Sequence, residues 1–208
     1  MNIIEALNWR YAVRQFSPEK IAPAVIQKLV EATRLSASAY GLQPYRLLVV
    51  RNRETRNQLL KHSFGQEKVR DCSHLFVLAI NTEINEAFLD QHFNMVEQQR
   101  DLPSGALNGF ANHVKDVMLS MTQAELKVWA ENQAHIALGN LLTVAAIEGV
   151  DACPMAGFDK SGFDAVLQLP RLGLASAVIC TLGQRADTDL SADYPKVRVP
   201  SAEFCLDM

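Results

Sequence analysis

Hydrophobic positions in the first 81 residues follow two spacings, and each spacing predicts one kind of element. Apolar residues at intervals of three and four predict helices over residues 2–9, 21–36 and 52–62. Short continuous runs of Leu, Val and Ile, bounded by turn or polar residues, predict buried strands over residues 45–51 and 74–81. The chain therefore begins by alternating helices with strands.

A helical pattern continues over residues 83–149, with a break near residues 101–105. Its last helix begins at a capping box formed by Thr122 and Glu125 and ends before Gly149, a residue suited to the position after a helix. The second half of this helix is apolar on several faces, so it must be covered on several sides. Its length is roughly 40 Å at the usual helical rise. Either a second subunit covers part of it, which predicts an obligate homodimer, or it is the central helix of a monomer.

The rest of the chain predicts an α+β class with an extended end. A strand-like turn at residues 151–154, a short helix over 160–167 and a strand over 175–182 follow the long helix. Residues 184–208 contain several Asp and Pro residues and little periodicity, so they predict an extended segment that must pack on something. We expect one domain over residues 1–183, with residues 184–208 as a C-terminal arm of the same domain.

The composition excludes several classes of protein. The 208 residues are 49% hydrophobic and 21% charged, which is typical of a folded globular chain. A net charge of −3 offers no field for a nucleic acid or an anionic membrane surface. No apolar stretch resembles a bilayer span, and the first ten residues lack the pattern of a signal peptide. Four widely spaced cysteines fit a reducing compartment, so we expect a cytoplasmic protein.

The common catalytic and nucleotide-binding motifs are absent from the sequence. No G-x-G-x-x-G follows a predicted strand, and there is no phosphate-binding P-loop, no G-x-S-x-G and no H-E-x-x-H. The five histidines and four cysteines show no metal-ligand spacing, so we expect no metal site.

Positively charged residues are the remaining candidates for chemistry. Arg10 and Arg14 stand four apart where the first helix should end, so a helical conformation would place both guanidinium groups on one face. Either both are simply exposed to water, or both hold one anion. Lys68, Lys196 and Arg198 are further positive charges that could converge with them from distant parts of the chain.

Five short motifs occur in order, at residues 10–16, 38–45, 71–74, 154–159 and 195–200. Together they resemble the motifs of the FMN-dependent nitroreductase family, in particular the oxygen-insensitive NAD(P)H nitroreductase and flavin reductase branch. The last motif, P-K-x-R-x-P, matches letter for letter, and the resemblance covers nearly the whole chain. It implies an α+β sandwich with a mixed antiparallel sheet flanked by helices, built as an intertwined homodimer with exchanged C-terminal arms.

The resemblance also implies that FMN is bound tightly and which residues hold it. Arg10, Lys196 and Arg198 would bind the phosphate and ribityl side, where bidentate cations are most useful. Arg14 and Lys68 would stabilise negative charge at N1 and O2 of the isoalloxazine ring. Further contacts are expected from Tyr11, Ala12, Ala37, Ser38, Ala39, Gln66, Pro154, Met155, Ala156 and Gly157, with Ser38 coming from the partner subunit.

Two departures from the family pattern affect this expected site. Ala12 stands where serine is usual, which removes a hydroxyl contact but keeps the backbone N–H. Ala156 stands where glutamate is often found, so a carboxylate on the donor and substrate side is missing. The resemblance places the substrate channel at Tyr40 and residues 110–121.

The resemblance implies a ping-pong oxidoreductase. NAD(P)H would stack on the open flavin face, give hydride to N5 and leave, and a nitroaromatic, quinone or flavin acceptor would then take the electrons in the same space. FMN carries this chemistry, so no catalytic side chain is required. Two alternatives remain: an FMN-binding sensory or storage module without efficient turnover, and a dimeric scaffold with a degenerate site.

Overall fold

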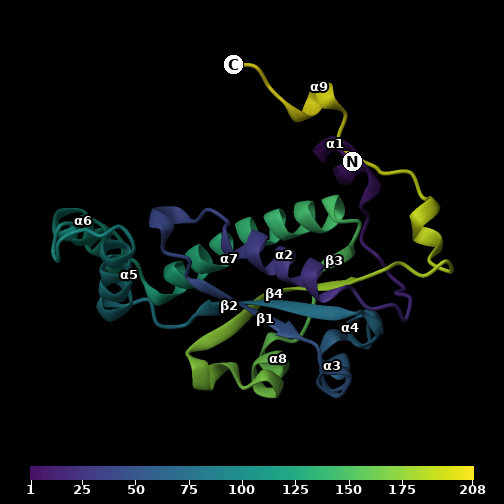
Figure 1. The fold of residues 1–208 in the computed structure, drawn as a ribbon, viewed down its shortest axis with the longest axis horizontal. Coiled ribbons are helices and arrows are strands. Elements are labelled where there is room, and N and C mark those ends of the chain that lie inside the picture. The colour runs from purple at the N-terminus through teal and green to yellow at the C-terminus, as the bar shows by residue number, and fades with distance from the viewer.

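A four-stranded sheet crosses the middle of the molecule (Figure 1). In this computed structural model, which describes residues 1–208, the strands are β1 (Tyr45–Val50), β2 (His74–Asn81), β3 (Asp151–Met155) and β4 (Leu174–Gly183). Their order is β1-β2-β4-β3, and every neighbouring pair is antiparallel. The sheet is therefore antiparallel throughout rather than mixed, and the parallel contact beside β3 is a single bridge between Ala12 and Ala152.

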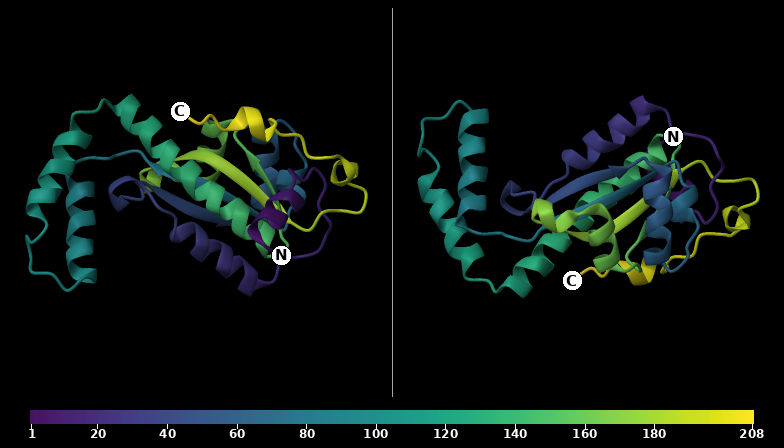
Figure 2. Two further views of the ribbon diagram at one scale, coloured as in Figure 1. Left: turned by 90° about the horizontal axis from the view of Figure 1, so that it is seen from above. Right: turned by 90° about the horizontal axis from the view of Figure 1, so that it is seen from below.

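Helices cover both faces of the sheet. They are α1 (Ile3–Trp9), α2 (Pro23–Arg34), α3 (Arg53–Leu60), α4 (Lys68–Asp71), α5 (Glu86–Gln99), α6 (Asn108–Leu119), α7 (Gln123–Ile147), α8 (Lys160–Leu167) and α9 (Ser201–Phe204). Helices α2 and α7 pack together on one face, whereas α3, α4 and α8 lie on the other (Figure 1). Helices α5 and α6 form a hairpin beyond one end of the sheet (Figure 2). This arrangement confirms the predicted α+β class.

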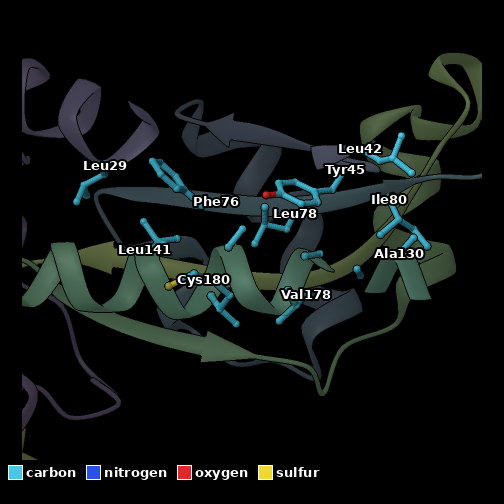
Figure 3. Packing of buried hydrophobic residues seen from close by; sticks show 14 of the residues in the cluster. Leu29, Leu42, Tyr45, Phe76, Leu78, Ile80, Ala130, Leu141, Val178 and Cys180 are labelled. Atoms are coloured by element: carbon cyan, nitrogen blue, oxygen red, sulfur yellow. The ribbon is translucent and has the colours of Figure 1, made fainter. Parts of the chain in front are cut away.

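Strand β2 is buried on both faces because it lies between β1 and β4 with helices on either side. Phe76, Leu78 and Ile80 belong to the large core cluster on the side of α7 (Figure 3). Leu75 and Val77 alternate with them and join a smaller cluster on the side of α8. Burial on both faces explains why this strand is a continuous apolar run rather than an alternating one.

The capping features predicted for the long helix are confirmed in α7. The Glu125 N–H donates to Thr122 Oγ1 at 3.3 Å, and the Thr122 N–H donates to Glu125 Oε2 at 2.8 Å. Gly149 follows the helix with a φ of +67°. One side of α7 is buried in the core, but Val128 and Ile136 are 57% and 47% exposed. Part of this helix therefore presents apolar side chains that one chain leaves uncovered.

The structure settles one point that the sequence left open and corrects one local prediction. The chain over residues 10–16 is not helical, because α1 ends at Trp9 and Arg10 is extended, with a ψ of 141°. Arg10 and Arg14 therefore do not share a helix face. Residues 151–155 form a full strand paired with β4 rather than a strand-like turn.

The C-terminal arm extends away from the sheet (yellow in Figure 1). It contains a short 3₁₀ helix at Leu190–Asp193 and the one-turn helix α9. Val197 and Phe204 in this arm are 82% and 81% exposed. The arm therefore carries apolar side chains that its own chain does not cover. None of the helices in the structure combines the length and the apolar character needed to cross a membrane.

Candidate functional site

Residues from both ends of the chain line one cavity of about 340 Å³. Arg10, Tyr11 and Ala12 follow helix α1, whereas Lys196 and Arg198 come from the C-terminal arm. Asn8, Trp9, Ser191, Ala192, Tyr194 and Pro195 complete the lining. The structure thus brings together five of the residues predicted to hold a cofactor. We call this space the cationic cavity.

The cationic cavity contains positive charge with no acidic side chain in its lining. Lys196 Nζ donates hydrogen bonds to the carbonyl oxygen of Leu7, at 2.9 Å, and to that of Arg10. Burial lowers the pKa of Lys196, and the charges of Arg10 and Arg198 lower it further. The Nε of Arg10 is buried and has no hydrogen-bond partner. Because buried cations without partners are costly, an anionic group such as a phosphate fits this cavity.

A second group of predicted residues lies against β3. Lys68, the first residue of α4, directs its Nζ to the Sγ of Cys153 at 3.3 Å. Gln66 Nε2 donates to the carbonyl oxygen of Gly157 at 3.4 Å. Ala12 pairs with the same strand through its parallel bridge. The residue that links the two groups is therefore Ala12, which lines the cationic cavity and lies beside β3.

The predicted segment at the end of β3 is half-buried or buried at its first two residues and exposed at its last two. Met155 is buried in the smaller core cluster, whereas Ala156 and Gly157 are exposed. With alanine at position 156, no carboxylate projects from this end of the strand. Small side chains allow a planar molecule to approach the backbone closely here.

The backbone that carries Arg14 is held by the Asp189 carboxylate. The N–H groups of Arg14 and Gln15 donate to it at 2.7 and 3.1 Å. Asp189 is 4% exposed. Burial alone would raise the pKa of this carboxyl, but these donors, together with Ser191, lower the pKa overall. The Arg14 side chain itself is exposed. Asp189 therefore holds the main chain of Arg14 but does not hold its guanidinium group.

The guanidinium of Arg185 lies close to the rings of two aromatic residues. Its Cζ is 4.4 Å from the centre of the Trp9 ring and 4.6 Å from that of the Tyr11 ring. Its Nη2 and Nε contact the Asp151 carboxylate at 2.7 and 2.9 Å. Burial, together with the nearby charge of Asp189, raises the pKa of Tyr11 to about 12. These contacts join the end of α1, the start of β3 and the start of the arm.

Sequence reasoning did not single out Asp151, Arg185 or Asp189. Each acts on residues from a distant part of the chain, so no local motif marks it. The available signal was the Asp content of the arm together with the arginines of the N-terminal segment. That signal indicates charge pairing, but it does not say which residues pair.

The predicted residues 37–40 follow the C-terminal end of α2, whereas the end of α1 and the arm, which line the cationic cavity, lie toward the other end of α2 (Figures 1 and 2). The Ala39 N–H donates to Gln133 Oε1 at 2.9 Å, and the centre of the Tyr40 ring is 6.3 Å from that of Phe110. Tyr40 has a φ of +55°, a strained conformation for any residue other than glycine. A separate cavity of about 820 Å³ lies between the start of β1 and α5. Within one chain, residues 37–40 therefore lie apart from the predicted residues of the cationic cavity and from those beside β3.

Comparison with known proteins identifies the family. The model of the nitroreductase family matches residues 7–184. The chain belongs to this family. YfkO of Bacillus subtilis (strain 168), which is named as an NAD(P)H nitroreductase, is 33% identical over 174 residues, or 80% of this chain and 79% of that protein. SERP2086 of Staphylococcus epidermidis, named in the same way, is 33% identical over 162 residues, or 76% of this chain and 74% of its own.

Solved nitroreductase structures share the fold. The nitroreductase ydfN of Bacillus subtilis matches with a TM-score of 0.86 at 19% identity, over 99% of this chain and 98% of that one. A nitroreductase of Exiguobacterium sibiricum, solved in complex with FMN, matches with a TM-score of 0.83 at 19% identity, over 100% of this chain and 98% of that one. These matches agree with the α+β sandwich expected from the sequence.

Proposed function

We propose that this nitroreductase-family protein is an FMN-dependent NAD(P)H oxidoreductase that passes electrons to nitroaromatic, quinone or flavin acceptors. The observation that carries the proposal is the cationic cavity, where Arg10, Lys196 and Arg198 meet without a carboxylate. A flavin phosphate supplies the missing negative charge. The name of YfkO and the FMN in the Exiguobacterium sibiricum protein support the same assignment.

The residues of the cationic cavity bind and orient the cofactor in this proposal. Arg10 has a buried Nε free to donate, and Lys196 and Arg198 add charge from the arm. The backbone N–H of Ala12 remains after loss of the family's serine hydroxyl, so binding there rests on the main chain. Charge-assisted donors of this kind suit a phosphate, because several can share one anion.

The residues beside β3 act at the ring end of the cofactor. Bound FMN would supply two-electron chemistry by taking up and giving back a hydride. Lys68 and Arg14 place positive charge at the ring edge that gains electrons, which favours the electron-rich form. The exposed backbone at Ala156 and Gly157 leaves room for a planar donor or acceptor. No side chain of this chain has to move a proton in this scheme.

We further propose that the working unit is a homodimer. The Ala37–Tyr40 turn lies away from the cationic cavity of its own chain, so the partner's copy would complete the site. The exposed apolar residues of α7 and of the arm need a cover, and a second copy of the chain provides one when the arms over residues 184–208 are exchanged.

All four cysteines are free, which supports the expected cytoplasmic location.

A spectrum of the purified protein tests the proposal. We expect flavin absorption in the visible range, and loss of that absorption when NADH or NADPH is added without oxygen. Colour that survives both donors would instead make the protein an FMN-binding sensory or storage module. A colourless protein that refuses added FMN would contradict both.

The Arg14→Ala variant tests the assignment of single residues. We expect FMN affinity to fall by about tenfold, because one charge-assisted contact is lost, and the anaerobic bleaching to slow. Arg171→Ala is the matched control, since Arg171 is an exposed arginine whose side chain contacts Gln168. Equal FMN retention and equal bleaching in the two variants would show that Arg14 has no role at the ring.

A further inference from the structure

A second basic cavity, of about 300 Å³, lies apart from the cationic cavity and shares no lining residue with it. Its walls are the segment that leads to α2 on one side and helices α3 and α4 on the other. Lys20, Arg53, Arg56, Arg70 and Asp71 line it, together with Phe16, Ser17 and Pro18. Four positive charges therefore face one negative charge. We call this space the α3–α4 cavity.

Arg56 is the buried cation of the α3–α4 cavity, with 2% of its surface exposed. Its Nε donates to the carbonyl oxygen of Arg70 at 3.1 Å, and its Nη1 donates to those of Arg51 and Ser73 at 2.8 and 3.2 Å. All of its hydrogen-bond partners are backbone carbonyls, and it forms no ion pair with a carboxylate. The Nη2 makes no hydrogen bond, so this end of the guanidinium remains free to donate.

Asp71 is the one acid in the lining, and its carboxylate is already shared. Arg70 Nη2 contacts it at 2.7 Å, and Arg53 Nη2 contacts it at 3.8 Å. Arg56 and Lys20 are left without a carboxylate partner. The excess positive charge also affects the neighbouring His74. Burial, together with the charges of Arg51, Arg56 and Lys20, lowers the pKa of His74 to about 4.

The walls of the α3–α4 cavity are fixed by hydrogen bonds and packing. The Ile21 N–H donates to the buried Ser73 Oγ at 2.9 Å, which holds the residue after Lys20. The Ser17 N–H donates to the Gln184 carbonyl oxygen at 2.8 Å. A ligand that binds here therefore meets donors that are already in place, which lowers the entropy lost on binding.

We propose that the α3–α4 cavity is a binding site for a phosphate group, held by Arg56 from inside and by Lys20 and Arg53 at the rim. A phosphate suits the site because it is compact, carries up to two negative charges and accepts several hydrogen bonds at once. The volume lies at the low end for small-molecule sites, about 300 Å³, so it takes one such group and not a whole dinucleotide. The group is either inorganic phosphate or the phosphate of a larger molecule, such as the 2′-phosphate of NADPH.

Equilibrium dialysis with labelled inorganic phosphate tests this proposal on the purified protein, in a phosphate-free buffer of constant ionic strength. We expect saturable binding, weakened by at least about tenfold in the double variant Lys20→Gln/Arg53→Gln. Both side chains are exposed, so this variant keeps the fold, which its unfolding temperature without phosphate verifies. Arg100→Gln/Arg171→Gln is the charge-matched control, because it removes two exposed arginines elsewhere and should bind phosphate as the wild type does.

The variant Lys196→Gln separates the two cavities. Phosphate binding that survives this change and is weakened in Lys20→Gln/Arg53→Gln supports the α3–α4 site. Binding lost only in Lys196→Gln, or equal in Lys20→Gln/Arg53→Gln and its charge-matched control, overturns it. A colourless protein would contradict the proposed flavin function without affecting this result.

Competition distinguishes the two sources of the phosphate group. If the site takes the donor's 2′-phosphate, NADPH displaces labelled phosphate from the wild type and NADH does not. If the site takes free phosphate, neither dinucleotide displaces it. Both outcomes support a phosphate site in the α3–α4 cavity, provided that Lys20→Gln/Arg53→Gln weakens the binding and its charge-matched control does not.

Discussion

The buried carboxylate of Asp189 holds the main chain of Arg14 and Gln15, so its charge state bears on the stability of this segment. Its pKa in the folded chain is lowered overall. The stabilisation is therefore present above the unfolded value of about 4 and is lost as the pH falls through the folded value. An asparagine at this position has one acceptor oxygen instead of two, so it can accept from Arg14 and Gln15 only as a neutral group and no longer accepts from Ser191.

We expect Asp189→Asn to lower the free energy of unfolding by about 2 kcal/mol at neutral pH, because three backbone N–H groups lose their charged acceptor. The difference from the wild type should shrink below about pH 4, where the wild-type carboxylate also takes up a proton. Urea unfolding across this pH range measures it. Asp187→Asn is the matched control, since Asp187 is exposed and should show no such pH-dependent difference. A difference that does not change with pH would contradict the charge argument.

At the scale of elements, helix α8 sits against the turn after α3 because residue 162 has no side chain. A Cβ on Gly162 would overlap the ring of His62. That ring contacts the carboxylate of Asp159, the N-cap of α8, through a bond of 2.9 Å between Nδ1 and Oδ2. The close approach of the two elements and the capping of α8 therefore depend on the same position.

We expect Gly162→Ala to destabilise the fold by about 1–3 kcal/mol, because the His62 ring must leave its place. For a domain of this size, that corresponds to a fall of roughly 2–4 °C in unfolding temperature per kcal/mol. Gly109→Ala is the matched control, because this helical glycine has no atom within 4 Å of the added Cβ. It should raise stability by up to about 1 kcal/mol. Equal unfolding temperatures for the two variants would contradict this account of α8.

At the scale of the whole molecule, apolar surface on the arm is what a second chain would bury. Val197, Phe204 and Leu206 are 82%, 81% and 77% exposed in the single chain. Burying side chains of this size is worth roughly 1.5–3 kcal/mol each before the cost of ordering the arm. The arm is therefore expected to contribute strongly to association.

Deleting residues 197–208 should weaken the dimer at least about a hundredfold, because several such side chains are lost together. Sedimentation equilibrium over a range of protein concentrations measures the dissociation constant. Deleting residues 207–208 alone is the control, since it shortens the chain but keeps the other apolar residues of the arm. A full-length protein that sediments as a single chain at every concentration would rule out the proposed assembly.

The elements that the sequence predicted well are those whose pattern arises from local burial. The strand over residues 74–81 was found because both of its faces are buried, which leaves a continuous apolar run. The start of α7 was found because a capping box acts between residues three apart. The sequence left open whether the chain after Trp9 is helical, because the extended conformation there depends on contacts with the distant Asp189 and Arg185.

The sequence by itself determined the α+β class, the family and the identity of the scattered cations, since periodicity and short motifs are local properties of the chain. Only the tertiary structure decided that Arg10 and Lys196 share a cavity, that Lys68 lies against Cys153 and that Arg56 is buried without a carboxylate. Such pairings depend on which distant surfaces pack together. Packing and charge balance are properties of the folded chain, so no window of sequence contains them.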